Sequence, residues 1–338
     1  MVTLKDIARK VGMSVTTVSR ALNDYNDVNP ETKLRIRQAA EEMGYRPNIL
    51  AQRLQKQKAD TIGFIIPTYG PRFSDPFFSE FLAGVGNKAS AFGFDLLVST
   101  HPPGDQELEA YRKFVEGRKV DGLIIVRTRQ IDERVNYLLE KDFPFTVFGS
   151  VEGKNDFLYV DEDGAYGMCL VTQHLINLGY KRISCIVPDP NLMFAKKRLA
   201  GFNEALANAN LEIPEEYIKQ GDLTQRSGYV QTLELLSLKK RPDAVVACND
   251  LMAFGAISAA QEKGLVVGKD IAVTGFDDIP LAEHFHPPLT TVHQPIYKIG
   301  NMVCEMLVGQ ILNKTITEKR IILKPNLIIR QSCGAHIS

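Results

Sequence analysis

The sequence predicts a small all-α head followed by a larger α/β body made of two Rossmann-like lobes. Three short helical patterns, each with its own start and stop signals, fill residues 1–46. From residue 59 onward, short apolar runs alternate with helical stretches, the order that produces a parallel sheet with helices on both faces. A chain of 338 residues has room for two or three domains at roughly 150 residues each.

Composition is typical of a globular protein outside membranes. The chain is 44% hydrophobic and 24% charged, and 40 basic residues balance 40 acidic ones. Its first residues lack the apolar core of a signal peptide, and no apolar run approaches the ~20 residues of a membrane span. The five cysteines are scattered without a C-x-x-C pair, which argues against a zinc ribbon or a disulfide framework. We therefore expect a cytoplasmic protein.

Charge is distributed unevenly along the chain. Residues 1–58 carry eleven Lys and Arg against six Asp and Glu, so the remainder is correspondingly acidic. A basic head on an acidic body suggests that the head meets a polyanion. Charge alone favours the simpler explanation, which is a solvated helical face.

The first predicted helix begins after Thr3. Its apolar face is formed by Leu4, Ile7, Ala8 and Val11. Thr3 followed by Asp6 is a capping-box-like start, and Gly12 is a stop signal. The helix is therefore expected to end by Gly12.

Two further helices complete the head. The second covers Val15–Leu22 behind the N-cap Ser14, and its inward residues are Val18, Ala21 and Leu22. The third begins at Asn29-Pro30 and ends at Gly44, with an apolar stripe of Leu34, Ala40 and Met43. Two short helices around a tight turn, braced by a third, make a helix-turn-helix unit.

The outer side of the second helix has the chemistry of a nucleic-acid contact. It presents Val15, Thr16, Thr17, Ser19 and Arg20. Small hydroxyl groups and a guanidinium suit phosphate oxygens and base edges.

The body contains eight predicted strands. They are Thr61–Pro67, Asp95–Ser99, Gly122–Val126, Phe145–Phe148, Phe157–Val160, Arg182–Val187, Ala244–Ala247 and Ile271–Phe276. Several are apolar on both faces, as buried parallel strands require. There are too many for one ordinary lobe, and a break falls near Tyr159–Gly164, so we expect two lobes with a ligand cleft between them.

Ligands of open α/β sheets lie beyond the carboxyl ends of the strands. Phe77 and Phe78 follow the first strand, and we expect one to face a ligand while the other packs the next helix. Arg198 suits a bidentate contact to ligand oxygens, although a solvated helix cation is an equal alternative.

Polar pairs end two later strands. Asn249-Asp250 follows one strand and Asp277-Asp278 follows another. Carboxylates there can accept neighbouring hydroxyls of a sugar. For Asp250 and Asp278 we favour helix N-capping instead.

Three runs of sequence carry a family resemblance. They extend from Thr3 to Asn23, from Val28 to Thr32 and from Gly44 to Asn48. They resemble the DNA-binding head of the lactose-repressor (LacI/GalR) family, and the resemblance continues along essentially the whole chain. It implies a DNA-binding domain at 1–46, a hinge at 47–58 and an effector-binding and dimerisation domain at 59–338.

The resemblance also implies lobes of periplasmic-binding-protein type between which the chain crosses three times. Lobe one then comprises 60–159 and 290–321, and lobe two comprises 160–289 and 322–338. The implied hinge helix wedges Leu54 into the minor groove, where an apolar side chain kinks DNA. The implied DNA contacts are Thr3, Ser14, Val15, Thr16, Thr17, Ser19, Arg20, Asn23, Tyr45, Asn48, Ala51 and Leu54.

The expected effector site combines the residues after the strands with those that the family pattern indicates. Its members are Phe77, Phe78, Arg198, Leu223, Asn249, Asp277 and Gln294. Leu223 falls where many members have a large aromatic, and Gly149 falls where some have an acidic side chain. Both departures leave room for a larger ligand.

The function implied is a sequence-specific DNA-binding transcriptional regulator. The leading interpretation is a repressor of carbohydrate-utilisation genes that a small saccharide releases from near-palindromic operator DNA. A repressor that needs a purine or another corepressor is the alternative. A sugar-binding transport protein is disfavoured by the head, and a sugar kinase is disfavoured because no nucleotide-binding loop is present.

We expect a homodimer that is neither an enzyme nor dependent on a cofactor or metal. His284-x-His286 fits a Pro-rich surface loop better than a metal site. The helix Phe77–Phe92 is the expected pairing face, with Phe81, Val85 and Phe92 to bury. No leucine heptad follows the last strand, which favours a dimer over a tetramer.

Overall fold

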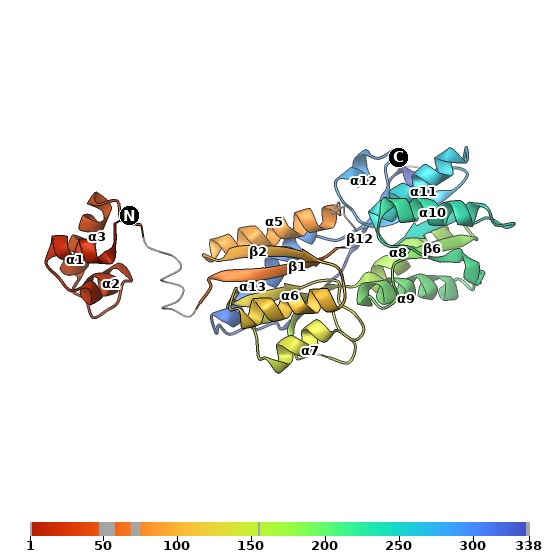
Figure 1. Ribbon diagram of the computed structural model, residues 1–338. Helices are drawn as coiled ribbons and strands as arrows, with labels where there is room; N and C mark the ends of the chain where they lie inside the picture. The colour runs from red at the N-terminus through yellow and green to blue at the C-terminus, as the bar shows by residue number, and fades with distance from the viewer. Residues whose placement is uncertain (1, 47–57, 69–74, 155, 336–338) are drawn as a thin grey trace. The chain divides into compact units, whose positions relative to one another are not determined.

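The structure is a computed structural model that describes residues 2–46, 58–68, 75–154 and 156–335. The chain divides into two compact units, Met1–Ala59 and Asp60–Ser338 (Figure 1). We expected the body to begin one residue earlier, at 59. Within the described segments, every helix is too short or too polar to span a lipid bilayer.

The head contains three helices: α1 (Leu4–Val11), α2 (Val15–Leu22) and α3 (Pro30–Glu42). The Asp6 carboxylate accepts hydrogen bonds from the amide (2.9 Å) and hydroxyl (2.7 Å) of Thr3, which completes the predicted capping box. Gly12 ends α1 in the left-handed conformation, at φ 68°. Ser14 accepts the Thr17 amide at 3.0 Å and caps α2.

The apolar stripe of α3 differs from the expected one. Ile36, Ala39 and Ala40 are buried against α1 and α2, whereas Leu34 is 59% exposed. Successive residues of a helix are about 100° apart around its axis, so Leu34, two positions before Ile36, points about 200° away from it. An apolar stripe that contains Ile36 therefore excludes Leu34. Ile36 thus completes the hydrophobic core of the head, and our expected stripe omitted it.

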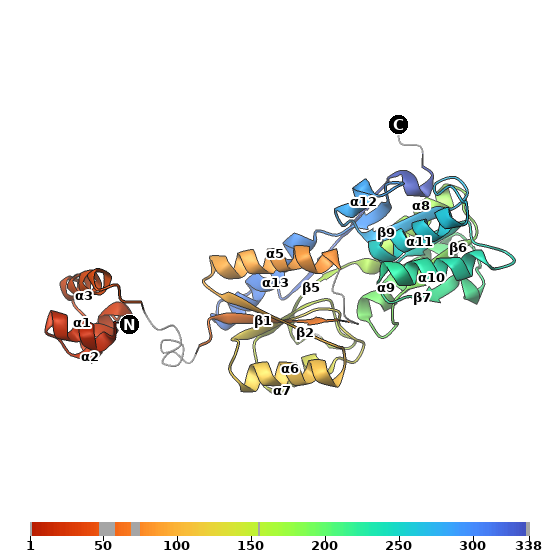
Figure 2. The same ribbon diagram turned by 45° about the horizontal axis from the view of Figure 1, so that its top comes forward.

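Lobe one is a six-stranded parallel sheet in the order β11-β5-β4-β3-β1-β2. Its strands are β1 (Thr61–Pro67), β2 (Asp95–His101), β3 (Gly122–Ile125), β4 (Phe145–Phe148), β5 (Leu158–Glu162) and β11 (Arg320–Leu323). Helices α5 (Pro76–Ala91) and α13 (Ile296–Ile311) cover one face, and α6 (Asp105–Glu116) and α7 (Glu133–Glu140) cover the other (Figure 2). All seven residues of β1 are buried, as a central parallel strand requires.

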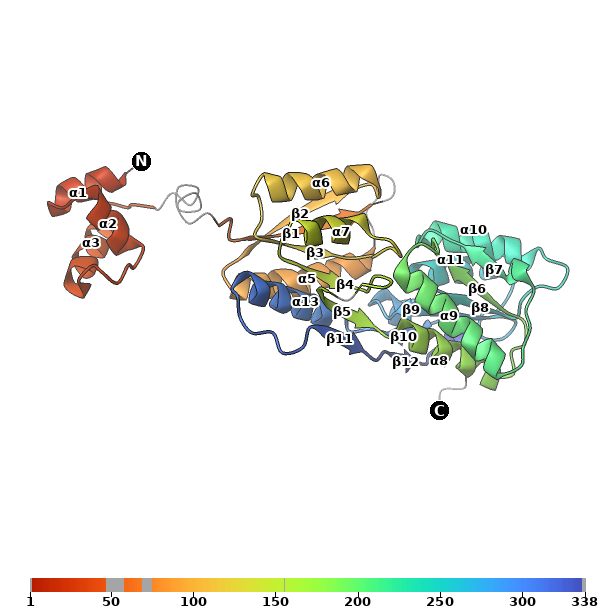
Figure 3. The same ribbon diagram turned by 90° about the horizontal axis from the view of Figure 1, so that it is seen from below.

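Lobe two is a second six-stranded sheet in the order β12-β10-β9-β8-β6-β7, in which β12 alone runs antiparallel to its neighbour. Its strands are β6 (Ile183–Val187), β7 (Ile218–Gln220), β8 (Ala244–Ala247), β9 (Ala272–Asp277), β10 (Thr290–His293) and β12 (Asn326–Ile328). Its helices are α8 (Gly164–Asn177), α9 (Met193–Asn208), α10 (Gln225–Leu236), α11 (Asp250–Glu262) and α12 (Leu281–His284), with short 3₁₀ turns at Glu215–Tyr217 and Gln331–Cys333. Helices α8 and α9 cover one face of this sheet, and α10 and α11 cover the other (Figure 3). These two layered lobes confirm the predicted fold class.

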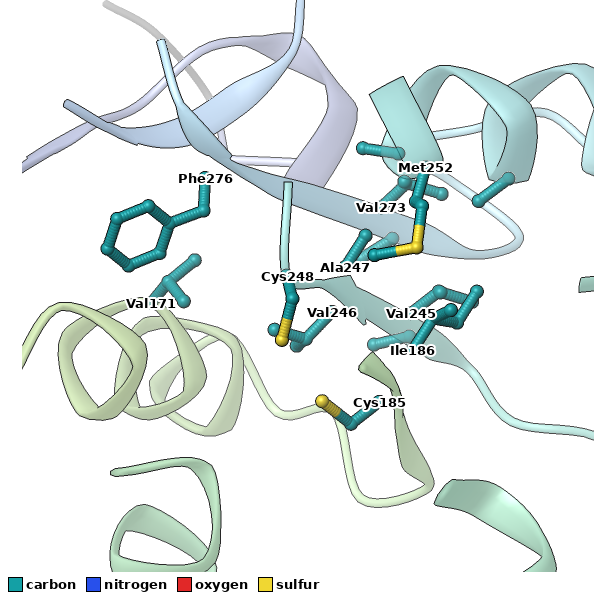
Figure 4. Packing of buried hydrophobic residues seen from close by; sticks show 14 of the residues in the cluster. Val171, Cys185, Ile186, Val245, Val246, Ala247, Cys248, Met252, Val273 and Phe276 are labelled. Carbon is teal, nitrogen blue, oxygen red and sulfur yellow. The ribbon is translucent and has the colours of Figure 1, made fainter. Parts of the chain in front are cut away.

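The core of lobe two combines aliphatic, aromatic and sulfur-containing side chains. Cys185 on β6 and Cys248 just after β8 point toward one another among apolar neighbours (Figure 4). Burial raises the pKa of the Cys185 thiol, so it packs as a small neutral side chain.

The chain passes between the two sheets three times: after β5, after β10 and after β11. The expected lobe boundaries were wrong in detail. Strand β10 (Thr290–His293) belongs to the second sheet, although we assigned residue 290 onward to lobe one. Conversely, β5 and β11 extend lobe one to Glu162 and Leu323. Sequence analysis did not anticipate β7, β10, β11 or β12, because three or four residues carry too little periodicity to detect.

Two of the three residues on the candidate pairing helix lie in the core of lobe one and not on its surface. Phe81 and Val85 are fully buried in the core that α5 shares with α13, and of the three expected residues Phe92 alone is exposed, at 37%. The face that holds Phe81 and Val85 is therefore unavailable to a second chain.

Candidate functional site

The described surface of the head presents several of the predicted DNA contacts. Thr3, Ser14, Val15, Thr16 and Arg20 are exposed, and Thr17, Ser19, Asn23 and Tyr45 are half-buried. Some of them also have a local role, since Ser14 and Thr17 form the cap of α2 and Asn23 Nδ2 donates to the Ser19 carbonyl at 2.9 Å. Asn48, Ala51 and Leu54 lie outside the described residues.

Arg20 is positioned by two neighbours beyond the end of α2. Its guanidinium forms an ion pair with Asp27 at 2.6 Å and lies 4.8 Å from the centre of the Tyr25 ring. The side chain remains 44% exposed, so the fork of donors is oriented without being buried.

A cavity of about 60 Å³ lies between the two sheets of the body. Its walls are Asp75, Phe77, Val126, Arg127, Thr128, Phe148, Gly149, Asp161, Glu162, Phe194, Arg198, Leu223, Asn249, Asp277 and Gln294. Both lobes contribute, as expected for a ligand site at the carboxyl ends of strands.

The cavity brings together six of the seven predicted effector residues. Phe77 lines it, whereas Phe78 is fully buried in the core of lobe one, 5.3 Å from Phe77 and edge-on to it. This division of roles between the two rings is the one we expected. Phe78 itself is therefore not a wall of the cavity.

Arg198 lines the cavity and is buried, so it is not a solvated cation. It is 4% exposed and pairs with Glu162 at 2.5 Å, while Asp277 lies 3.6 Å away. It also donates to the Cys248 carbonyl and lies 3.5 Å from the centre of the Phe276 ring. Because Glu162 belongs to lobe one and Arg198 to lobe two, this ion pair joins the lobes.

Three buried polar atoms in these walls lack a hydrogen-bond partner among the described residues: Glu162 Oε2, Arg198 Nε and Gln294 Oε1. Buried polar groups in proteins are nearly always satisfied. These two acceptors and one donor belong to residues that line one cavity, and hydroxyl groups, which both donate and accept, are suited to pair with them.

Carboxylates outnumber cations in the cavity wall. Four acidic side chains, Asp75, Asp161, Glu162 and Asp277, face two guanidiniums, Arg127 and Arg198. Burial raises the pKa of Asp75, Glu162 and Asp277, although the neighbouring arginines oppose this shift. Such a wall disfavours an anionic ligand and accepts a neutral one.

Asn249 has a structural role in addition to lining the cavity. Its side chain caps α11 by accepting the Met252 amide at 3.0 Å, and its Nδ2 donates to the Leu223 carbonyl at 3.0 Å. Leu223 is held in the left-handed region at φ 71°, an uncommon conformation for a branched side chain. The hydrogen bond from Asn249 to the Leu223 carbonyl thus fixes the loop that brings Leu223 to the cavity.

The expected N-capping by Asp250 and Asp278 was wrong. Asp250 is the first residue of α11, and its buried carboxylate accepts the Ile279 amide and the Thr291 hydroxyl. Asp278 pairs with His293 at 2.9 Å and with Arg330 at 2.8 Å. Both carboxylates join separate strands of lobe two, which a local sequence pattern does not encode.

Sequence analysis missed several walls of the cavity. Arg127, Thr128 and Phe148 lie at or just past the ends of β3 and β4, where the rule that located Asn249 and Asp277 would also have found them. Phe194 lies one helical turn before Arg198 on α9, and that spacing was a second available signal.

The two histidines of His284-x-His286 lie at the end of a short helix and just beyond it. His284 ends α12 and His286 lies in the following loop. Across the described segments, no three His, Cys, Asp or Glu side chains are grouped as metal ligands.

A helix-turn-helix head linked to a two-lobed α/β body with a cavity between its sheets defines a class of proteins, the DNA-binding regulators with a periplasmic-binding-protein-like domain. Residues 3–48 match the family described as bacterial regulatory proteins, lacI family, and residues 172–333 match the periplasmic binding protein-like domain.

Curated relatives agree with these matches over nearly the full length. The regulator AglR of Rhizobium meliloti (strain 1021) is 35% identical over 98% of this chain and 94% of its own. The repressor PurR of Aliivibrio fischeri (strain MJ11) is 33% identical over 98% of both. The chain therefore belongs to the lacI family of transcriptional regulators.

Solved structures give the same result. A complex of the transcriptional regulator CelR with cellobiose is 32% identical with a TM-score of 0.76, over 98% of this chain and all of the other. A lac repressor dimer bound to operator and an anti-inducer is 27% identical with a TM-score of 0.86, over 99% of both.

Proposed function

We propose that this regulator is a repressor of carbohydrate-utilisation genes that binds near-palindromic operator DNA as a homodimer and is released by a small neutral saccharide. The observation that carries the proposal is the cavity wall, which combines unpaired polar atoms and surplus carboxylates with the aromatic rings of Phe77, Phe148 and Phe194. Hydroxyls satisfy the polar atoms, and a sugar C–H face packs on an aromatic ring.

Relatives support this choice of ligand. One similar structure is a regulator with bound cellobiose, and it covers essentially the whole chain. The lac repressor similarity supports the dimer on operator DNA.

A purine-dependent repressor is the second candidate, and two observations favour it. Repressors named PurR are about equally similar to this chain. In addition, Phe77, Phe148 and Phe194 all line the cavity, and an aromatic wall also suits a flat base.

Calorimetric titration of the full chain with cellobiose, smaller sugars, hypoxanthine and guanine separates the two candidates. We expect heat from a saccharide and none from the purines. Asp277→Ala and Arg198→Ala should each weaken saccharide binding by at least tenfold, since each removes a charge-assisted hydrogen bond of about 1.5–3 kcal/mol. Arg226→Ala, an exposed position on α10 outside the cavity wall, is the matched control.

Two outcomes of these titrations would contradict the proposal. Binding of a purine with no response to any sugar refutes the carbohydrate proposal. A variant that folds, by its melting curve, and binds like the parent removes that residue from the site.

A further inference from the structure

The two lobes touch through a strand-like contact at the rim of the cavity. The segment 128–130 follows β3 in lobe one, and the segment 190–193 leads into α9 in lobe two. Arg129 and Leu192 form an antiparallel bridge, and the Met193 amide donates to the Thr128 carbonyl at 2.8 Å. We name these two segments together the rim latch.

Gln130 makes most of the polar contacts in the rim latch. Its amide donates to the Asn191 carbonyl at 2.9 Å, and its Nε2 donates to the Pro190 carbonyl at 3.0 Å. Its Oε1 accepts from Lys196 Nζ at 3.3 Å, and Lys196 also pairs with Glu152 at 2.8 Å. Gln130 is not a wall of the cavity, so these contacts connect lobe to lobe and not lobe to ligand.

A buried charge network braces the lobe-one side of the latch. Arg134, 1% exposed, pairs with Glu107 at 2.5 Å and with Asp132 at 2.6 Å, and it donates to the Arg127 carbonyl at 3.2 Å. Asp132 accepts the Arg129 amide at 3.1 Å. The segment is therefore ordered before the lobes meet, and closure costs less conformational entropy.

Each side of the latch continues into a wall of the cavity. Thr128 lines the cavity from lobe one, and α9, which starts at Met193, carries Phe194 and Arg198 into it from lobe two. The Met193 amide belongs to the first turn of α9, where no partner exists within the helix. Lobe one supplies that partner only while the lobes are closed.

The walls of the cavity come from both lobes, so a movement of one lobe relative to the other changes how a ligand reaches it. The rim latch joins the lobes beside this cavity, and its interlobe hydrogen bonds break when the lobes separate.

We propose that Gln130 is a positioning residue, which holds the lobes closed through the rim latch and thereby sets ligand affinity without touching the ligand. The inference goes beyond the choice between a saccharide and a purine, since it concerns the closing contact itself. Removing the Gln130 side chain leaves the backbone bonds in place but shifts the population toward the open arrangement.

Hydrogen–deuterium exchange of the full chain without ligand tests the proposal. In Gln130→Ala, the amide of Met193, on the opposite lobe, should exchange at least about fivefold faster, because two side-chain hydrogen bonds between the lobes are lost. The amide of Leu178, bonded within lobe two to the His174 carbonyl at 3.1 Å and remote from the latch in sequence, is the internal reference and should not change. Ile131→Ala, an 81% exposed neighbour, is the matched control.

A second measurement follows ligand release, with cellobiose as the probe. Gln130→Ala should speed dissociation severalfold and leave association unchanged or faster, since the open state is the one that admits the ligand. Partial misfolding would lower the bound fraction without changing the dissociation rate.

Unchanged Met193 exchange in Gln130→Ala overturns the proposal. If that exchange rises but no saccharide binds, the latch stands and the proposed ligand class fails. If saccharide binding is normal and exchange is unchanged, the proposed function stands and the latch fails.

Discussion

Two neighbouring side chains orient Arg20 before any DNA is bound. The ion pair with Asp27 and the ring of Tyr25 restrict its rotamers, so less entropy is lost when it meets DNA. A planar guanidinium matches the two acceptors of guanine in the major groove. The neighbouring cap of α2 is made by Ser14, which keeps the helix start rigid.

Arg20→Ala should weaken binding to the preferred operator by about 1–3 kcal/mol and affect random DNA far less, because a base contact carries sequence information and a phosphate contact does not. Fluorescence anisotropy with an operator selected from random DNA by the parent chain measures both. Asp27→Asn removes the ion-pair partner but keeps the guanidinium, so discrimination should persist. Equal losses on both DNAs would make Arg20 a phosphate contact.

At the scale of elements, Asp250 joins three parts of lobe two. From the first turn of α11, its carboxylate accepts the Ile279 amide at 2.9 Å and the Thr291 hydroxyl at 2.5 Å. These contacts tie α11 to the turn after β9 and to β10. Burial raises the pKa of Asp250 to about 7, against the opposing effect of both hydrogen bonds.

The raised pKa predicts a pH-dependent stability. Between about pH 4 and pH 7, the folded state keeps a proton on Asp250 that the unfolded chain has already released. The stability linked to this proton is fully present below about pH 4 and is lost as the pH rises through about 7. Asp250→Asn should therefore flatten the dependence of unfolding free energy on pH between 5 and 7, by up to about 1.4 kcal/mol per pH unit. Urea unfolding followed by circular dichroism measures the slope.

Glu283→Gln, at an exposed position on α12, is the control for that slope. The substitution Asp250→Asn keeps one acceptor oxygen of the two, so some loss of stability at a single pH is expected. The test is the slope with pH and not that loss. Identical slopes in the parent and in Asp250→Asn would refute the assignment.

At the scale of the whole molecule, the three crossings between the sheets couple the lobes. The second crossing runs through His293 and Gln294, which contact Asp278 at 2.9 Å and Asp277 at 2.6 Å. Asp277 and Gln294 also line the cavity. A ligand that touches them therefore acts directly on the segment that joins the lobes, as differential binding to two arrangements requires.

The full chain should sediment as a dimer at micromolar concentration, because two symmetric heads are needed to contact the two halves of a near-palindromic site. DNA with one half-site scrambled should bind far more weakly than the intact operator. A monomer that binds both DNAs alike would contradict the prediction, and so would a stable tetramer. Phe81 and Val85 will not be part of the dimer contact, since both are in the core of lobe one.

Local signals in the sequence determined the head and the central strands. A capping box, an N-cap and a left-handed glycine act within four residues of one another, so Thr3, Ser14 and Gly12 specify helix ends without distant help. Strands that are apolar on both faces can also be recognised in the sequence, because burial in a parallel sheet requires apolar residues on both faces. The ends of those strands located Asn249, Asp277 and Phe77 at the cavity.

The tertiary structure decided what depends on pairing between distant segments. The sheet to which β10 or β11 belongs is set by long-range register, to which three or four residues contribute almost no pattern. The same holds for Asp250, which resembles a cap in sequence but bonds to the turn after β9 and to β10, 29 and 41 residues away. Gln130 has no local signature at all, since its partners are brought to it by the closure of the two lobes.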